Sequence, residues 1–130
     1  MSHKILLCED EEFVARSFIR KLELEGFTVR RAHNGQQALD MLKVEPVDLI
    51  LLDLMMPIKS GFDVLAEVQV SDNELLKRTP IVVASNLGQK SDIEEAKRLG
   101  AKDFIVKSNV SLKELVSKVR EFLPAEQTNA

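Results

Sequence analysis

The sequence predicts a doubly wound α/β fold, in which helices cover both faces of a single five-stranded parallel sheet. Short apolar runs alternate five times with longer segments of helical period, and parallel strands joined by crossover helices have this pattern. The third run is almost continuously apolar, as expected for a central strand that is buried on both faces. The predicted strands are residues 4–8, 27–31, 47–52, 80–84 and 102–106.

The segments between these runs carry apolar residues that fall on one face of a helix. Val14, Phe18 and Leu22 recur at intervals of four after the first strand, which is helical spacing. Near the C-terminus, one face of the last helix is marked by Leu112, Leu115, Val116, Val119 and Phe122. Both faces are suited to cover a sheet.

Capping residues mark where the helices should begin and end. Gly26 and Gly100 stand at expected helix ends, because glycine readily adopts the left-handed backbone that closes a helix. Three pairs match capping boxes or closely related helix starts: Asn34 with Gln37, Ser91 with Glu94, and Ser111 with Glu114.

The length and composition indicate one folded domain. The chain has 130 residues, of which 45% are hydrophobic and 30% charged, and these are ordinary values for a globular protein. Neither a repeat nor a low-complexity linker interrupts the alternation of strands and helices. We therefore expect one domain over residues 1–124 and a short polar tail over residues 125–130.

Charge and cysteine content exclude several classes of function. A formal net charge of −3 provides no broad positive field, so we expect protein partners and no nucleic acid. The single cysteine, Cys8, cannot form an internal disulfide, which fits a reducing cytoplasm. The first apolar run stops at Glu9, too early for a signal peptide or a spanning helix, so we expect a cytoplasmic protein outside the membrane.

The residues that follow the predicted strands are unusually polar. Ligands of an open parallel sheet bind beyond the carboxyl ends of its strands. Glu9 and Asp10 follow the first strand, Asp53 the third, Ser85 the fourth and Lys107 the fifth. We therefore expect three carboxylates, a hydroxyl and an ammonium to converge on one rim of the sheet.

This set of groups is suited to phosphoryl transfer. Crowded carboxylates repel one another unless a cation is present, and Mg²⁺ prefers such oxygen ligands together with water and phosphate oxygens. Asp53 would act as the nucleophile and form an acyl phosphate. Lys107 and Mg²⁺ would neutralise the transferred group, and the Ser85 hydroxyl would donate a hydrogen bond to it.

Four motifs in order resemble the response-regulator receiver family of two-component signalling, over about residues 4–123. The motifs are ILLCEDE at 5–11, DLMMPIKSG at 53–61, PIVVAS at 80–85 and GAKDFIVK at 100–107. The resemblance implies a flavodoxin-like sheet with strand order 2-1-3-4-5. In a chain of this length it implies a stand-alone switch and not an enzyme, with Mg²⁺-dependent phosphorylation and dephosphorylation of Asp53 as its only chemistry.

The resemblance also implies the metal ligands and the phosphoryl donor. Asp10 and Asp53 would bind Mg²⁺ directly, Glu9 would act through a water molecule, and the backbone carbonyl of Met55 would complete the protein ligands. The phosphoryl group would come from a histidine kinase or a phosphotransfer protein, with Asp53 as the phosphoacceptor.

The resemblance also implies which residues pass the phosphorylated state on to a partner. In the family, the hydroxyl residue at the Ser85 position and the aromatic residue at the Phe104 position move together on phosphorylation. They link the site to a face formed by the fourth and fifth helices and the fifth strand, which a downstream protein partner would bind. For Phe104 a plain core role is an equally good interpretation, because strand aromatics are usually buried.

Two departures from the family pattern keep a second function open. Ser108 stands where the family usually has proline after its lysine, and Glu9 replaces the commoner aspartate. The alternative is a receiver-like adaptor that binds partners without being phosphorylated. A flavin carrier or an aspartyl phosphatase is weaker still, because the chain lacks Trp and Tyr and has no aspartate two residues after Asp53.

Overall fold

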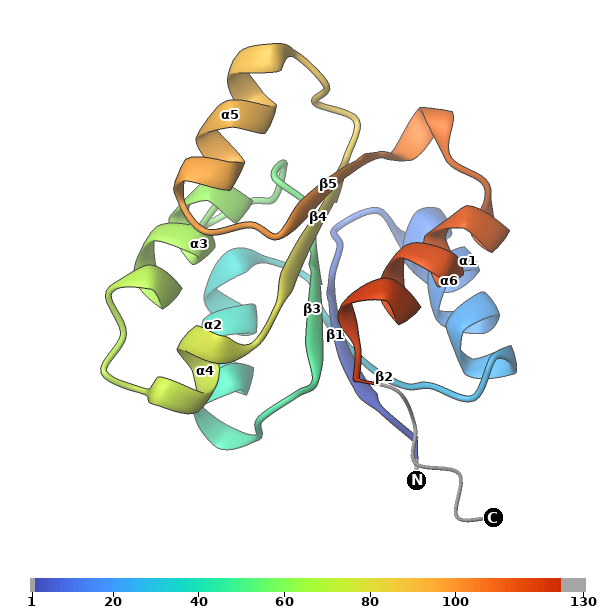
Figure 1. Ribbon diagram of the computed structural model, residues 1–130, viewed down its shortest axis with the longest axis horizontal. Coiled ribbons are helices and arrows are strands. Elements are labelled where there is room, and N and C mark those ends of the chain that lie inside the picture. The colour runs from blue at the N-terminus through green and yellow to red at the C-terminus, as the bar shows by residue number, and fades with distance from the viewer. Residues whose placement is uncertain (1, 125–130) are drawn as a thin grey trace.

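The computed structural model describes residues 2–124, in which a parallel sheet lies between two layers of helices (Figure 1). The strands are β1 Lys4–Cys8, β2 Thr28–Ala32, β3 Leu49–Leu52, β4 Ile81–Ser85 and β5 Asp103–Val106. Their order is β2-β1-β3-β4-β5, which confirms the predicted fold and the central place of the third strand. The predicted tail, residues 125–130, lies outside the described residues.

The strand bounds differ from the predicted ones by one or two residues. β2 and β4 each lie one residue further along the chain than expected, and β3 and β5 begin later than expected. Ser85 therefore ends β4 instead of following it. The prediction that polar residues gather at the carboxyl ends of the strands is unaffected by these shifts.

Helices cover both faces of the sheet. α1 and α6 lie on one side, and α2, α3 and α5 lie on the other (Figure 1). The helices are α1 Glu12–Leu24, α2 Gly35–Val44, α3 Gly61–Gln69, α4 Glu74–Arg78, α5 Lys90–Arg98 and α6 Leu112–Phe122, with a 3₁₀ turn η1 at Lys107–Asn109.

The strands divide their side chains between two apolar layers. In β1, Ile5 and Leu7 pack with α1 and α6, while Leu6 and Cys8 pack with α2, α3 and α5. All four residues of β3 are buried, which is why that strand has an uninterrupted apolar sequence. Cys8 is one of these core residues and has no exposed surface.

Most of the predicted helix ends are confirmed. The Asn34 side chain accepts a hydrogen bond from the Gln37 N–H, and Ser111 forms a capping box with Glu114. Gly26 and Gly100 have φ values of 96° and 110°, so both adopt the left-handed conformation expected at a helix end.

Three features of the helices differ from the prediction. Ser91 does not cap a helix, because α5 starts at Lys90 and its N-cap is Gln89, two residues before Ser91. Leu112 is 39% exposed, since it opens α6 and the buried face starts one turn later. The short helix α4 was not predicted, so the helices expected as the fourth and fifth are α5 and α6.

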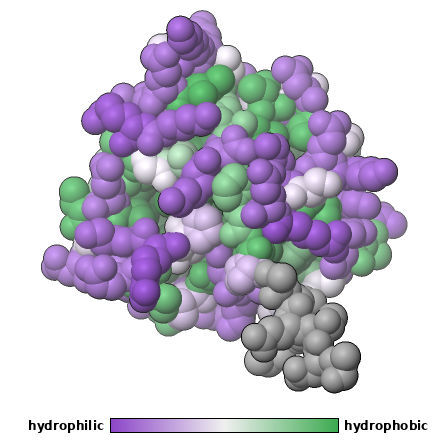
Figure 2. Space-filling model, in the orientation of Figure 1, coloured by the Kyte–Doolittle hydropathy of each residue, from purple (hydrophilic) through white to green (hydrophobic). Residues whose placement is uncertain are grey.

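Exposed apolar side chains are scattered over the surface of the described residues. On the face in Figure 2, hydrophobic residues form separate patches between hydrophilic ones, as on many folded proteins. In the range 2–124, every helix is too short or too polar to cross a bilayer.

An ion pair joins β5 to α6. The Lys118 ammonium lies 2.8 Å from Asp103 Oδ2, and the Phe104 N–H donates to Asp103 Oδ1 at 2.7 Å. Partial burial raises the pKa of Asp103, but the hydrogen bonds from Lys118 and Phe104 outweigh it, so the pKa is lowered overall. The folded protein therefore favours the ionised form of this carboxyl group.

The stabilising contribution of Asp103 should depend on pH. It is fully present above the pKa of an unfolded aspartate, about 3.9, and is lost as the pH falls through the lowered pKa of the folded state. We expect Asp103→Asn to lower the free energy of unfolding at neutral pH, with the difference from wild type closing below about pH 4. Urea unfolding followed by circular dichroism measures this difference. Asp72→Asn, at an exposed loop residue, is the control. A difference that does not vary with pH would contradict the assignment.

Candidate functional site

The carboxyl ends of β1 and β3 bring Glu9 and Asp53 side by side. Cys8 pairs with Leu52 in the parallel register, and the Asp53 N–H donates to the Cys8 carbonyl at 3.0 Å. The next residue of each strand is therefore Glu9 or Asp53, at the same rim. Both residues are buried, although both are acidic.

Lys107 lies between these two carboxylates. Its Nζ is 2.7 Å from Glu9 Oε1 and 3.1 Å from Asp53 Oδ2. The side chains of Lys107, Glu9 and Asp53 are 8%, 2% and 7% exposed, so all three charges are almost removed from water. The residues are 98 and 54 positions apart in the sequence, and only the fold brings them together.

The second oxygen of each carboxylate is held by the backbone. Glu9 Oε2 accepts from the Glu11 N–H at 3.1 Å, and Asp53 Oδ1 accepts from the Met55 N–H at 3.2 Å. Each carboxylate is thus fixed at both oxygens, once by the ammonium and once by its own loop. The two side chains are held in defined orientations before any ligand binds.

Burial, hydrogen bonds and neighbouring charges shift the pKa values of Glu9 and Lys107. Burial raises the pKa of Glu9, and the hydrogen bond from Lys107 only partly offsets this, while the nearby Asp53 charge raises it further. Burial lowers the pKa of Lys107, but the two carboxylates outweigh it and raise the pKa overall. Lys107 is therefore a firmly charged ammonium at neutral pH.

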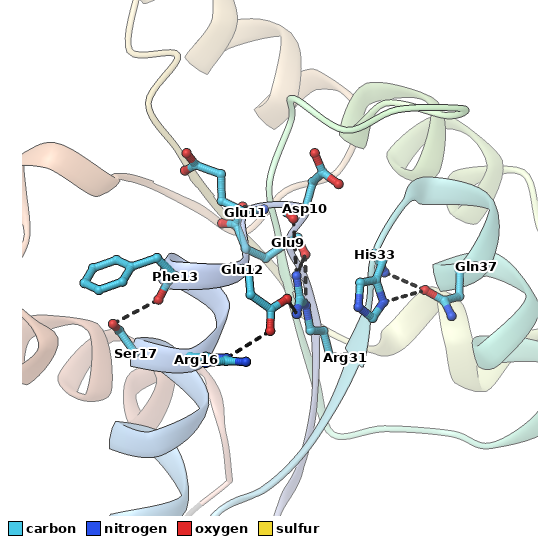
Figure 3. A network of polar contacts seen from close by, with 10 residues as sticks. All are labelled: Glu9, Asp10, Glu11, Glu12, Phe13, Arg16, Ser17, Arg31, His33 and Gln37. Atoms are coloured by element: carbon cyan, nitrogen blue, oxygen red, sulfur yellow. Dashed lines mark hydrogen bonds and ion pairs between the residues drawn. The ribbon is translucent and has the colours of Figure 1, made fainter.

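Asp10 lies at the same rim but in a different environment. It is exposed, and in Figure 3 its carboxylate points away from the loop backbone that carries it. In residues 2–124, His, Cys, Asp and Glu side chains form no group of three or more spaced to hold a metal ion. At Glu9 and Asp53, the Lys107 ammonium partly balances the two carboxylates.

The donor chemistry nevertheless fits a hard divalent cation. The carboxylates of Asp10 and Asp53 and the carbonyl of Met55 are oxygen ligands of the type that Mg²⁺ prefers. They belong to two loops at the carboxyl end of neighbouring strands. The expected ligand set is thus chemically suitable.

Ser85 is the last residue of β4, and Phe104 lies in the neighbouring strand β5. Ser85 is completely buried, and its hydroxyl oxygen accepts from the Leu87 N–H at 3.3 Å. Within the described range, Ser85 has no hydrogen bond to Asp53 or Lys107. Phe104 is partly buried and packs on the layer formed with α2, α3 and α5.

The sequence of the chain matches one known protein family. Residues 5–120 match the model of the response regulator receiver domain. The chain belongs to this family. It is accordingly a receiver domain of the two-component response regulators.

The receiver domain is similar to parts of longer regulators. It is 37% identical over 121 residues to the transcriptional regulatory protein CpxR of Escherichia coli, covering 93% of the chain and 49% of CpxR. It is 34% identical over 128 residues to the transcriptional regulatory protein SrrA of Staphylococcus aureus, covering 98% of the chain and 51% of SrrA. The chain therefore spans about half the length of these curated relatives.

Solved structures show the same fold. The chemotaxis protein CheY4 of Vibrio cholerae superposes with a TM-score of 0.86 at 24% identity, covering 95% of this chain and 100% of CheY4. The receiver domain of the Francisella response regulator 1452 superposes with a TM-score of 0.83 at 26% identity, covering 93% and 96%.

Ser108, the departure from the family pattern next to Lys107, forms a contact that proline cannot form. Its N–H donates to the Asn86 side-chain oxygen at 3.0 Å, and proline has no N–H. Every peptide bond in the described range is trans. Lys107 still reaches both carboxylates, so the receiver domain holds this loop by a different contact.

Arg31 is a further residue of the rim that the sequence analysis missed. It lies near the end of the edge strand β2 and reaches the loop between β1 and α1 (Figure 3). Its guanidinium donates to the backbone carbonyls of Glu9 and Asp10 and to the Glu12 carboxylate. Arg31 is 22 residues from Glu9 in the sequence, and their contact depends on the pairing of β1 with β2.

Gly61 allows the loop after Asp53 to return to the sheet. The Gly61 N–H donates to the Leu54 carbonyl at 3.0 Å, and a Cβ at Gly61 would overlap the Asp53 carbonyl oxygen. Ser60 and Asp63 form a capping box that starts α3 at this point. The glycine in the DLMMPIKSG motif is therefore required by the close approach of two backbones.

We expect Gly61→Ala to destabilise the receiver domain. Helix propensity alone favours alanine over glycine in α3. Overlap of the new Cβ with the Asp53 backbone costs about 1–3 kcal/mol. The sign of the change in the free energy of unfolding therefore shows which effect dominates. The free energy of unfolding from a urea titration measures it. Gly88→Ala is the comparison, because its Cβ would meet only the Val106 side chain, at 3.2 Å. A more stable Gly61→Ala variant would show that the loop moves freely.

Proposed function

We propose that this receiver domain accepts a phosphoryl group on Asp53 from the phosphohistidine of a histidine kinase or a phosphotransfer protein. The observation that carries the proposal is the buried contact of Lys107 with Asp53 and Glu9. A carboxylate held beside a fixed ammonium is prepared to bind a group that carries further negative charge.

In the proposed reaction, a carboxylate oxygen of Asp53 attacks phosphorus while the phosphorus–nitrogen bond of the donor breaks. The donor imidazole takes the electron pair of that bond, and Asp53 becomes an acyl phosphate. Lys107, already 3.1 Å from Asp53, would contact the transferred oxygens without a large movement. The backbone N–H of Met55 keeps the carboxylate oriented during the attack.

The charge balance of the rim supports a role for Mg²⁺. The Lys107 ammonium balances only one of the two carboxylates of Glu9 and Asp53, and Asp10 adds a further carboxylate. Asp10, Asp53 and the Met55 carbonyl would hold the cation, with Glu9 acting through water. Bound there, Mg²⁺ would supply positive charge to the phosphoryl oxygens.

Phosphorylation of Asp53 is tested directly with a small phosphodonor. We expect acetyl phosphate and Mg²⁺ to add the mass of one phosphoryl group to the intact protein, because the donor needs only the rim itself. Asp53→Asn should abolish the addition, and Asp72→Asn, in an exposed loop, should leave it unchanged. Intact-protein mass spectrometry measures both.

The same experiment separates the switch from the adaptor. If wild type gains no mass while a receiver of known activity is modified in parallel, the phosphorylation-independent adaptor is the better explanation. Addition that persists in Asp53→Asn would place the phosphoacceptor elsewhere.

We also propose that Ser85 and Phe104 transmit the phosphorylated state to a protein partner. Val83 pairs with Phe104, and Ser85 pairs with Val106, so Ser85 lies two residues beyond the partner of Phe104. Alternate residues of a strand share a face, which puts Ser85 and Phe104 on the same face of the sheet. Movement of the Ser85 hydroxyl toward a phosphoryl oxygen would thus change the space next to Phe104.

The output face would consist of α5, β5 and α6, which correspond to the fourth and fifth helices and fifth strand of the sequence analysis. A groove on this face is lined by Phe104, Val110 and Lys118, so the ring borders the surface where a partner would bind. Phosphorylation would shift the population between two arrangements of this face by bonding better to one of them.

Coupling between the site and this face is testable by NMR. We expect beryllofluoride with Mg²⁺, which mimics the acyl phosphate, to shift amide signals from Asp53 through Ser85 to Phe104. Ser85→Ala should confine the shifts to the neighbourhood of Asp53, because the transmitting hydroxyl is removed. Asp53→Asn is the control that removes the attachment point. Purely local shifts in wild type would refute the transmission route.

A further inference from the structure

Arg31 makes an unusually complete set of contacts with the loop that carries the two acidic residues of the site. Its Nε and Nη2 both donate to the Glu9 carbonyl at 3.1 Å, and Nη2 also donates to the Asp10 carbonyl at 3.3 Å. Its Nη1 lies 2.5 Å from Glu12 Oε2. The side chain is only 12% exposed, so these bonds form largely out of water.

These contacts restrict the direction of the Asp10 side chain. Two successive carbonyls bound to one planar guanidinium fix the peptide planes on either side of Asp10. In Figure 3 the guanidinium lies on one side of the loop, and the Asp10 carboxylate projects on the other. Without the guanidinium, the exposed Asp10 would be carried by a freer loop.

The charge of Arg31 is balanced locally. Glu12 Oε2 pairs with Arg31 and Glu12 Oε1 pairs with Arg16 at 3.0 Å, so one carboxylate bridges two guanidinium groups. The pKa of Glu12 is lowered, first by the hydrogen bond from Arg31 and then by that from Arg16. Arg31 can therefore hold the acidic loop while much of its own charge is neutralised.

We propose that Arg31 is a positioning residue for the cation that binds at Asp10 and Asp53. It acts through the backbone of the β1–α1 loop and contacts neither the metal nor the phosphoryl group. The inference rests on the proposed function, since it concerns the same metal site. Residues that orient metal ligands from behind typically change metal affinity by about 10-fold to 100-fold when they are replaced.

The sign of the effect separates positioning from simple electrostatics. Removal of a positive charge near a cation site should strengthen cation binding, because a repulsion disappears. Loss of the fixed loop should weaken it. Arg31→Met should therefore bind Mg²⁺ about tenfold more weakly than wild type if Arg31 orients Asp10, and more tightly if only its charge matters.

The experiment is a Mg²⁺ titration without phosphodonor, followed by calorimetry and by NMR amide shifts. Arg30→Met is the matched control, because it removes the same charge from the neighbouring position of β2, where Arg30 is 60% exposed and pairs only loosely with Glu45 at 3.8 Å. Arg31→Lys keeps the charge but loses the planar guanidinium that binds the Glu9 and Asp10 carbonyls together. We therefore expect it to lose less Mg²⁺ affinity than Arg31→Met. Thermal unfolding of each variant establishes that the titrations are made on folded protein.

The outcomes distinguish this inference from the proposed function. Weaker binding in Arg31→Met and Arg31→Lys, with Arg30→Met unchanged, supports positioning. Wild-type or tighter binding in the Arg31 variants overturns it, even if Asp53 is phosphorylated normally. If Arg31→Met does not fold, Arg31→Lys decides alone. If wild type binds no Mg²⁺ and gains no phosphoryl group, the proposed function itself is wrong and the inference is wrong with it.

Discussion

The buried contact of one ammonium with two carboxylates is the interaction on which this site depends. Charges removed from water are expensive, and their mutual attraction offsets the loss only when the geometry is good and the remaining atoms are hydrogen-bonded. Lys107, Glu9 and Asp53 meet this condition, because Lys107 and backbone N–H groups hold all four carboxylate oxygens. The three strand ends that carry these residues are consequently held together by charge as well as by the sheet.

The loops after β1 and β5 are each fixed by a contact from a distant part of the chain. The β1–α1 loop is bound by Arg31 from β2, and the loop after β5 is bound by Asn86 from the end of β4. The loop after β3 returns over Gly61, where two backbones touch. Loops are ordinarily the mobile parts of a domain. Here their backbones are tied, while the apolar core below sets the positions of the strands.

The fold and the meeting of Glu9, Asp53 and Lys107 were accessible from the sequence, because both follow from periodicity and from the rule that parallel strands end at one edge. Local capping signals were less decisive, since Ser91 has the required spacing but Gln89 precedes the helix. The roles of Arg31 and Asn86 were not accessible. Each depends on register between strands and on a rotamer, and neither leaves a pattern along the chain.

The sheet separates two apolar layers, and Ser85 and Phe104 both belong to the side covered by α2, α3 and α5. The opposite layer, built on α1 and α6, shares strands with it but no side chains. A rearrangement around Phe104 therefore requires repacking on one side only. In the proposed switch, the layer built on α1 and α6 would therefore stay unchanged and support the strands while the side chains around Phe104 repack.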